Sequence, residues 1–497
     1  MPRNANSAPT VPKERIPPAM RSLMIAVVVL FAVAISAAGS ADSTERPLTP
    51  EDRESLSVTV YGNGLAFIRD RRALGDLESD TRIAFVGVSP RMISDSAVLS
   101  GPFGVKQITY AFDLLTPDAL LRAALGNTVR VVRTHPTTGE ETVEPATVMS
   151  VAGGVVLKYR DRVETGVPGR LVFDDTPADL RPQPTLIAEV TPPTNNGDGD
   201  VAELAYLTEG LAWRADYVVV LNATEKRLDL AGRAMLTNVS GTDMAAASIG
   251  LVAGNVRRVS AGGVAPAPKA AFDGSVRAMA AEAAPIPQRE TLGDLHLHSL
   301  PGPITLRDRE TRQVALLDVN SVAVEQTYVS EAGAPVFGPS RGAPARPTYP
   351  EVRYTFRNAA DGDAGQPLPA GVARVYARDS RGDLRLLGED HLPATPVGEE
   401  VELNPGQAFD ITVERTQTDF VRSGLPKGVF ESAHRVEARN AKDSAVTVRI
   451  EEVLTGDWRI LEESAPHRKD AANRAVWELP VPAGGAAVLT YRVRVSR

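Results

Sequence analysis

The sequence predicts a mainly β fold. It combines an immunoglobulin-like β-sandwich in the C-terminal part with an N-terminal β-rich domain that holds a small barrel-like meander and one short helix. Three observations predict this. After residue 54, apolar and polar side chains alternate along most segments, as in strands with one buried and one solvated face. Turn residues separate these segments at short intervals. One segment carries clear helix start and stop signals.

The N-terminal β-rich domain, residues 54–190, is predicted to begin with a hairpin. Asn63-Gly64 separates the strand-like segments 57–61 and 65–71, and both turn residues tolerate the positive φ of a tight hairpin. Two more short strands are predicted at 81–88 and 105–112.

The helix is predicted in the segment TPDALLRAALG, residues 116–126. Thr116 can cap its first turn, Pro117 suits the first helical position, and Asp118 complements the helix dipole. Gly126 is suited to end it. We expect this short helix to close one end of a sheet or barrel.

A meander of short strands is predicted at 128–175, within the same domain. Its strands are expected at 128–134, 142–151, 155–163 and 170–173. Because tight turns such as Gly153-Gly154 separate them, we expect a small closed barrel. The turn-rich segment TPPTNNGDGD, residues 191–200, is predicted to be a linker between domains.

Residues 201–497 are predicted to form a second domain, a β-sandwich interrupted by flexible loops at 260–291 and 331–350, which are rich in Ala, Pro and Gly. Its early strands are expected at 201–207, 216–221, 227–238 and 248–252. Its late strands have one apolar face each, formed by Phe409, Ile411 and Val413, by Val446, Val448 and Ile450, and by Leu489, Tyr491, Val493 and Val495. Two such sheets packed face to face make a sandwich.

The composition excludes several classes of function. The chain has 62 acidic and 54 basic residues and a net charge of −8, which argues against nucleic acid as a partner because phosphate binding needs a basic surface. It has no cysteine, which excludes disulfides, thiolate metal sites and a cysteine nucleophile.

The N-terminal residues 1–41 predict export. Arg21 precedes an uncharged run from Leu23 to Ala41 that ends in small residues, as in a secretory signal peptide. The alternative is an uncleaved membrane anchor, because the run would span about 28 Å as a helix, close to a bilayer core of about 30 Å. Both alternatives place the rest of the chain in the periplasm or on the outer face of the inner membrane. Translation could start at Met1 or at Met20.

Three segments resemble one bacterial family of exported proteins. They are AYLTEGLAWRADYVVVL (205–221), PLPAGVARVYARDSRGDLRLLGEDHLPATPVGE (367–399) and WELPVPAGGAAVLTYRVRV (477–495). Together they resemble the domain of unknown function 4139, whose relatives include mucoidy-inhibitor-like proteins. The resemblance implies an exported, β-rich protein with an immunoglobulin-like C-terminal part, and it supplies no catalytic residues. The chain lacks the long coiled-coil insertion of the mucoidy-inhibitor-like members.

The segment GDLHLHSL, residues 293–300, is the first candidate site. On a strand, His296 and His298 would share a face about 6.6 Å apart and could hold Zn²⁺ through bonds of about 2.1 Å. Asp294 would lie too far from His298 to share the ion comfortably, so a third ligand would have to come from another strand. We favour the alternative that Leu295 and Leu297 face the core and the histidines face solvent on an edge strand.

Three other motifs are weaker candidates. The pattern of Gly338–Gly342 fits a nucleophile elbow, but the proline-rich residues after it do not favour the helix that this motif needs. The acidic turns 195–200 and 361–363 lack the downstream glutamate of a calcium loop and are interpreted as solvated turns. The basic cluster RDRR, residues 69–72, would split its charges between both faces of a strand, so a solvated edge is favoured over an anion site.

The tryptophans are predicted to be packing residues with bonded N–H groups, although an aromatic ring can also stack on a sugar. They are Trp213, Trp458 and Trp477.

From these patterns the sequence assigns no catalytic, metal or cofactor-binding residue and no cofactor. It favours a non-catalytic exported protein that binds another envelope protein or polymer, without nucleic acid, and touches the membrane only through residues 23–41 if these are not cleaved. One alternative is a hydrolase of envelope glycans or peptides, metal-assisted through His296 and His298. Another is a purely architectural spacer.

Overall fold

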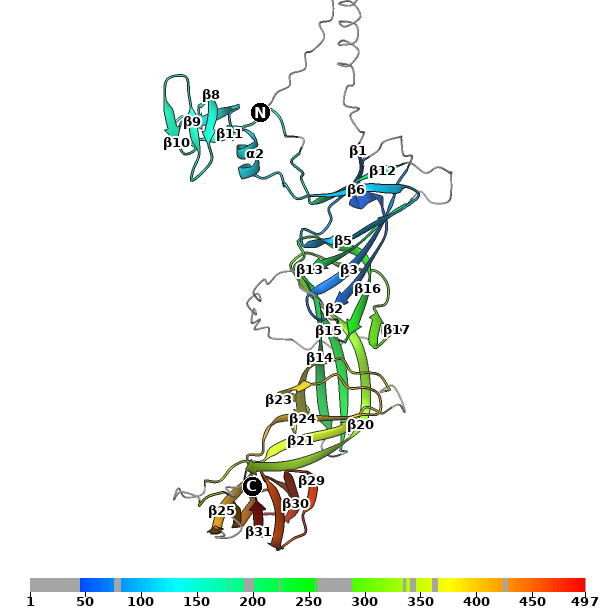
Figure 1. The fold of residues 1–497 in the computed structure, drawn as a ribbon, viewed down its shortest axis with the longest axis vertical. Helices are drawn as coiled ribbons and strands as arrows, with labels where there is room; N and C mark the ends of the chain where they lie inside the picture. Colours follow the sequence, from blue (N-terminus) through cyan, green and yellow to red (C-terminus); the bar gives the residue numbers. More distant parts are fainter. Residues whose placement is uncertain are drawn as a thin grey trace, which may run out of the picture.

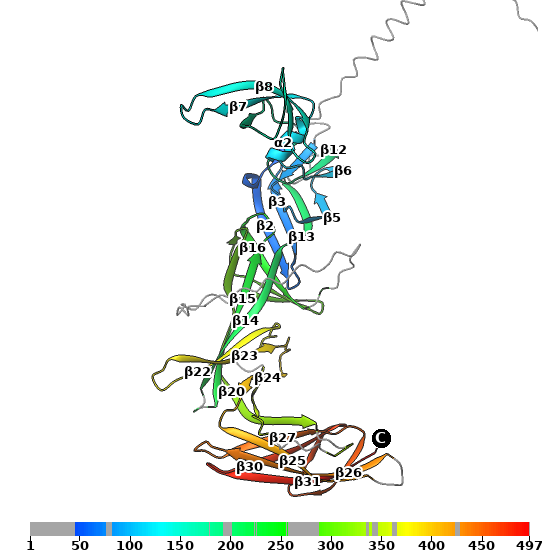
Figure 2. The same ribbon diagram turned by 90° about the vertical axis from the view of Figure 1, so that its left-hand side faces the viewer.

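The computed structural model describes residues 45–496 with gaps at 76–81, 178, 192–200, 223, 225, 255, 257–287, 334–336, 340–345, 360–364 and 423–427. The molecule is a mainly β, elongated stack of sheets, with the N-terminal sheets at one end and the C-terminal strands at the other (Figures 1 and 2). Residues 1–41, the predicted signal or anchor, lie outside the described residues. Within the described part, no helix is long and apolar enough to cross a membrane.

Two sheets form the N-terminal end of the stack. The N-terminal sheet has the order β1 (Glu45–Leu48), β4 (Arg82–Val86), β12 (Thr185–Thr191) and β6 (Gly104–Ala111). The hairpin sheet has the order β17 (Gln288–Leu292), β18 (Leu295–Ser299), β16 (Met244–Ala253), β2 (Arg53–Tyr61), β3 (Leu65–Ala73), β13 (Val201–Glu209) and β5 (Met92–Ser100), and β19 (Ile304–Leu306) pairs with β16. A short 3₁₀ helix, η1 (Pro50–Asp52), precedes β2.

Two further sheets form the middle and the C-terminal end. The long sheet has the order β23 (Leu384–Leu392), β22 (Gly371–Arg378), β14 (Leu211–Asn222), β15 (Arg227–Asn238), β20 (Glu310–Gly333), β27 (Val446–Val453), β30 (Arg474–Val481) and β29 (Arg468–Ala471), and β21 (Glu351–Arg357) joins β20 to β24 (Glu400–Gln407). The C-terminal sheet has the order β25 (Ile411–Arg422), β26 (Val429–Asn440), β31 (Ala486–Ser496) and β28 (Asp457–Glu463).

The predicted hairpin and helix are confirmed. β2 pairs with β3, and Gly64 in the turn has φ +82°, the conformation for which glycine is suited. Helix α2 (Pro117–Ala123) begins where the backbone N–H of Ala119 donates to the Thr116 hydroxyl at 3.1 Å. Local side-chain and backbone chemistry determines both features, which is why the sequence alone predicts them.

The predicted barrel at 128–175 is an open sheet instead. Its order is β10 (Val163–Thr165), β9 (Val156–Lys158), β8 (Glu141–Ser150), β7 (Thr128–Thr134) and β11 (Arg170–Val172), and its two outer strands do not pair with each other within the described residues. The predicted strand 155–163 breaks into β9 and β10, because Tyr159 N–H donates to Arg162 O across a turn. The three-residue outer strands are too short to complete a barrel.

Strand pairing runs across the predicted domain boundary at 191–200. β13 pairs with β3 and β5, and β16 pairs in parallel with β2, so residues on both sides of the predicted linker share the hairpin sheet. One hydrophobic core accordingly runs through the N-terminal, hairpin and long sheets. The meander sheet has a small core of its own.

The structure describes only parts of the two predicted loops, and some of these parts belong to strands. Residues 260–287 of the first lie outside the described part, and 288–291 belong to β17. Residues 331–333 of the second belong to β20, and Thr348 bridges Val413. Residues 334–336 and 340–345 lie outside the described part.

The C-terminal sheet and part of the long sheet enclose a second core. Side chains of β25, β26 and β31 meet those of β27 and β30 there. The predicted inward residues Ile411, Val413, Val448 and Ile450 are buried, whereas Phe409 is 86% exposed, since it precedes the first residue of β25. The arrangement is that of two packed sheets; its immunoglobulin-like character remains a prediction.

β20 joins these two cores as one strand of 24 residues. It pairs with β15 in the middle of the molecule and with β27 near the C-terminal end. Ser321 interrupts its regular pairing with φ +59°, and its N–H donates to Asp229 Oδ1 at 2.8 Å. The strand therefore bends at a hydrogen-bonded bulge and continues.

Candidate functional site

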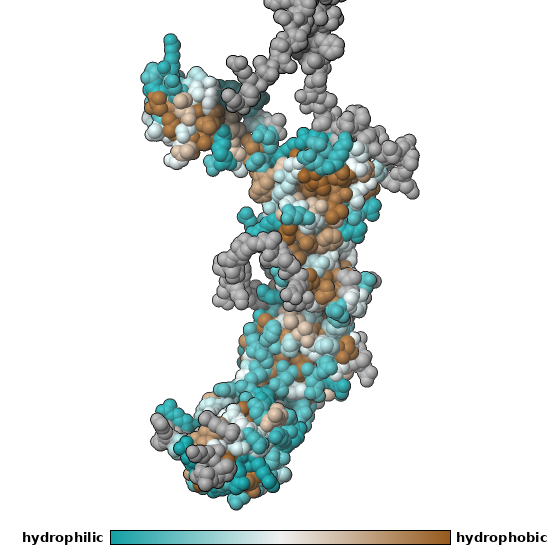
Figure 3. Space-filling view, viewed as in Figure 1, coloured by the Kyte–Doolittle hydropathy of each residue, from teal (hydrophilic) through white to brown (hydrophobic). Residues whose placement is uncertain are grey.

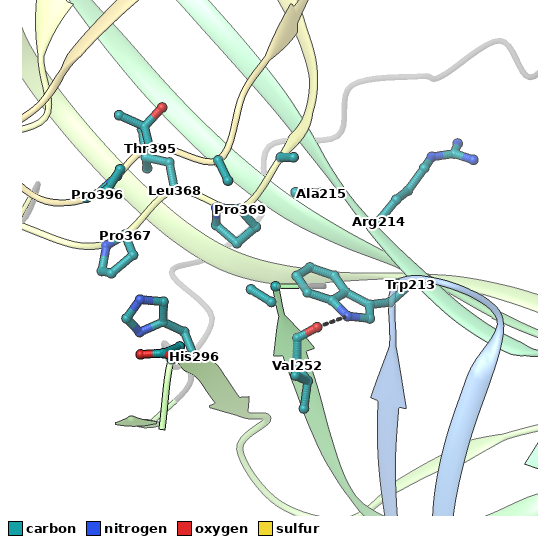
Figure 4. Close-up of a pocket in the computed structure, with 16 residues that line it drawn as sticks. Trp213, Arg214, Ala215, Val252, His296, Pro367, Leu368, Pro369, Thr395 and Pro396 are labelled. Atoms are coloured by element: carbon teal, nitrogen blue, oxygen red, sulfur yellow. Dashed lines mark hydrogen bonds between the residues drawn. The ribbon is translucent and has the colours of Figure 1, made fainter. Parts of the chain in front are cut away.

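A pocket of about 540 Å³ lies between the hairpin sheet and two loops that flank β22 and β23. It is lined by Gly62, Trp213–Ala215, Val252–Gly254, Asp294, His296, Pro367–Ala370 and Ala394–Pro396. We call it the Trp213 pocket. Figure 4 shows Trp213 and His296 on one side and the proline-containing loops on the other.

Trp213 is held in place from within the fold. It lies on β14, and its indole N–H donates to Val252 O at 3.0 Å. Its ring centroid is 6.4 Å from that of His298. Because the N–H is already bonded, the indole presents hydrocarbon surface to the pocket. The predicted packing role of Trp213 is confirmed, and the same side chain also lines the pocket.

The two histidines of β18 have different surroundings. His296 is partly buried and lines the Trp213 pocket, whereas His298 is fully buried against Trp213. Leu297 and Leu295 lie over Gly250 and Gly254, where an added Cβ would come within 2.8 Å and 2.5 Å of their side chains.

The prediction of two solvent-facing histidines on an edge strand is therefore wrong. β18 pairs with β16 on one side and β17 on the other, and His298 is fully buried while His296 is partly buried. Alternation separates two faces of a strand, but it does not show that both are packed.

The metal hypothesis needs a third ligand beside the two histidines. Within the described residues, no group of three or more His, Cys, Asp or Glu side chains could hold a metal ion. Asp294 lines the same pocket as His296. The structure therefore brings together two of the three residues of the DLHLH motif and directs the third into the core.

The loop wall of the pocket is apolar and held by backbone bonds. Leu368 and Thr395 exchange two N–H···O=C bonds of 2.9 Å, which join the two loops. The Tyr217 hydroxyl donates to Pro369 O at 2.6 Å, and the Asn358 amide donates to Pro396 O at 3.0 Å. The wall is thus preformed. The paired Pro residues in PLPAG and LPATP are the sequence signal that could have indicated it.

The charged groups at the pocket are Arg214 and Asp294. Arg214 Nε lies 3.6 Å from Asp216 Oδ2, and its guanidinium extends away from His296 and the prolines in Figure 4. Thr395 donates its hydroxyl to Pro393 O at 2.9 Å. The pocket therefore combines an apolar body with the carboxylate of Asp294 and the imidazole of His296.

The basic cluster RDRR divides between the two faces of β3, as predicted, but not on a solvated edge. Arg69 pairs with Glu203 on the exposed face. Arg72 is fully buried, contacts Asp70 at 2.6 Å, and donates to the carbonyls of Leu48 and Val86. β3 lies between β2 and β13, so it is not an edge strand. The bonds of Arg72 to Leu48 on β1 and Val86 on β4 join the hairpin sheet to the N-terminal sheet.

Trp458 and Trp477 are packing residues in the C-terminal core. Trp458 donates to Ala472 O at 2.8 Å, and Trp477 donates to Glu463 Oε2 at 3.0 Å. Trp477 stacks on Tyr491, whose ring stacks on His434, with centroid distances of 4.8 Å and 5.0 Å. Both tryptophans are more than nine-tenths buried, which leaves no open ring face for a sugar.

An exposed apolar surface lies at the other end of the molecule, along β5 and β6. β6 is the last strand of the N-terminal sheet and pairs with β12 alone among the described strands. The exposed apolar residues here are Val98, Val105, Ile108, Phe112 and Leu115, at 62%, 39%, 38%, 50% and 39% exposure. We call this the β6 edge; Figure 3 shows hydrophobic surface around these strands.

The remaining sequence candidates lie largely outside the described residues. Residues 195–200 and 361–363 are not described, and the same is true of Ser340, Arg341 and Gly342 in the elbow pattern. No protein-family model matches the chain, and no curated protein matches it.

Proposed function

We propose that this chain is a non-catalytic binding protein of the cell envelope, which docks a partner protein along the β6 edge. The observation that carries the proposal is a strand that pairs with β12 alone among the described strands and holds apolar side chains in solvent. Such an edge is a template for an added strand, and natural proteins usually blunt it with charge, proline or a cover.

The side chains of β6 support strand addition. Val105 and Ile108 lie opposite Val190 and Ala188 of β12, whose side chains are buried in the core. The apolar face of the N-terminal sheet therefore continues onto β6, where Val105 and Ile108 remain partly exposed to solvent. A partner strand would pair with the side of β6 that faces away from β12 and would bury the exposed parts of Val105 and Ile108. The envelope location rests on residues 23–41 and on the family resemblance.

The test is photo-crosslinking in the envelope fraction. A photoreactive residue at the exposed Gln107 should give a defined adduct, and Val105→Lys with Ile108→Lys should abolish it. The matched control is Val143→Lys, since Val143 is 55% exposed on the separate meander sheet. If circular dichroism shows folded protein and Gln107 gives no adduct, the docking function is wrong. N-terminal sequencing of the mature chain tests export: a start near residue 42 indicates cleavage.

A further inference from the structure

We propose that the Trp213 pocket binds an extended peptide segment that places an apolar side chain against the loop wall and a cationic group at Asp294. This site is separate from the β6 edge. Its volume of about 540 Å³ falls within the range of about 300 to 1,000 Å³ that is common for ligand pockets.

The apolar half of the ligand follows from the walls. Pro367, Pro369 and Pro396 supply ring hydrocarbon on the loop side, and Trp213 supplies its ring opposite. Two backbone bonds between Leu368 and Thr395 hold the loops together before any ligand arrives. A preformed apolar cleft loses little conformational freedom on binding, which favours an apolar side chain entering it.

The cationic half follows from the charges. Asp294 lines the pocket, while Arg214 already pairs with Asp216 and extends away from the loops. The chain as a whole is acidic, with a net charge of −8. A lysine, arginine or amino terminus next to the apolar group would form a charge-assisted hydrogen bond with Asp294. His296, beside it, can donate or accept a further bond.

A peptide fits these groups better than an oligosaccharide does. A sugar ring carries several hydroxyls that need partners when they leave water. Two of the polar groups of the pocket are already bonded within the protein, the Trp213 N–H to Val252 O and the Thr395 hydroxyl to Pro393 O. Of the other polar side chains of the lining, Arg214 extends away from the loops, and Asp294 with His296 suits one cationic group better than a ring of hydroxyls.

In the experiment, the full chain selects binders from a random dodecapeptide display library. Fluorescence polarisation then measures the affinity of the chain for each recovered peptide. We expect recovered sequences to place Lys or Arg next to an apolar residue. Ala394→Trp, at an exposed position of the lining, should abolish binding by filling the pocket. Asp294→Asn should weaken it about tenfold, the loss of one charge-assisted bond.

Matched control variants show whether a loss of peptide binding comes from the Trp213 pocket or from another change in the protein. Ala152→Trp places the same side chain on an exposed turn of the meander sheet and should leave binding unchanged. Val105→Lys with Ile108→Lys should also leave it unchanged, so failure of the β6 docking function does not decide this proposal. Failure to recover any peptide sensitive to Ala394→Trp overturns it. Binding of the peptidoglycan disaccharide of N-acetylglucosamine and N-acetylmuramic acid in place of peptides, blocked by Ala394→Trp, also overturns it.

Discussion

Arg415 Nε lies 2.8 Å from Glu452 Oε1, and this ion pair joins the C-terminal sheet to the long sheet. Arg415 also donates to the hydroxyl and the carbonyl of Ser330 on β20. Glu452 is fully buried beside Ile450 and Glu451. The ion pair with Arg415 therefore compensates for the water that its carboxylate loses on folding. Burial raises the pKa of Glu452, while Arg415 acts to lower it.

Arg415→Met should destabilise the C-terminal core by about 3 to 5 kcal/mol, because it leaves a buried carboxylate without its cation. Chemical denaturation followed by Trp fluorescence measures this. The double variant Arg415→Met with Glu452→Leu should regain most of the loss, since a buried ion pair is replaced by apolar contacts. Equal stability of the single and double variants would contradict the assignment. The single variant should regain stability from pH 7 to pH 5, as the carboxyl with the raised pKa takes up a proton.

His434 should make the C-terminal core sensitive to acid. Burial lowers its pKa to about 4 from an ordinary value of 6.5, and its Nε2 lies 2.8 Å from the Ser432 hydroxyl. As pH falls, His434 takes up a proton in the unfolded chain before it does so in the folded chain. The stability that neutral His434 contributes is therefore present above pH 6.5 and is lost between pH 6.5 and pH 4. The loss amounts to about 3 kcal/mol.

Comparison with His434→Gln isolates this contribution. Unfolding free energies of both proteins, measured from pH 7 to pH 4, should converge as the pH falls. Parallel curves across this range would show that His434 is not the group responsible.

Arg72→Met should destabilise the junction of the N-terminal and hairpin sheets by about 3 to 5 kcal/mol, because Asp70 loses a buried partner. Arg69→Met is the control on the same strand. Arg69 is 52% exposed in its side chain, so its pair with Glu203 should contribute less than about 1 kcal/mol. Thermal unfolding of the two variants measures the difference, and similar losses would refute the buried role of Arg72.

Zinc should not bind stoichiometrically at His296 and His298. His298 is enclosed against Trp213, and the described residues supply no three-ligand group around the pair. Calorimetric titration with Zn²⁺ should give the same heat for the parent chain and for His296→Ala. A one-to-one isotherm that His296→Ala removes would restore the metal hypothesis.

The sequence predicted the features that local chemistry determines. Asn63-Gly64 specifies a hairpin, and Thr116 with Pro117 specifies a helix start, because each acts through neighbouring backbone groups. The alternation around Ile411 and Val413 predicted which side chains are buried.

Long-range pairing was beyond the sequence. β13 pairs with β3 although about 130 residues separate Glu203 from Arg71 along the chain. No local pattern encodes such a partner. The sequence therefore predicted a domain boundary at 191–200, although strands on both sides of it belong to the same sheet. For the same reason the burial of His298 and the Trp213 pocket were missed, since distant segments complete both.

The 24-residue strand β20 has a mechanical consequence. It would reach about 80 Å if straight, and it belongs to both of the larger cores. A load applied between the ends of the molecule would pass along one covalent backbone and would have to shear its hydrogen bonds with β15 and β27 together. Any bending between the two halves should therefore be concentrated at the bulge of Ser321.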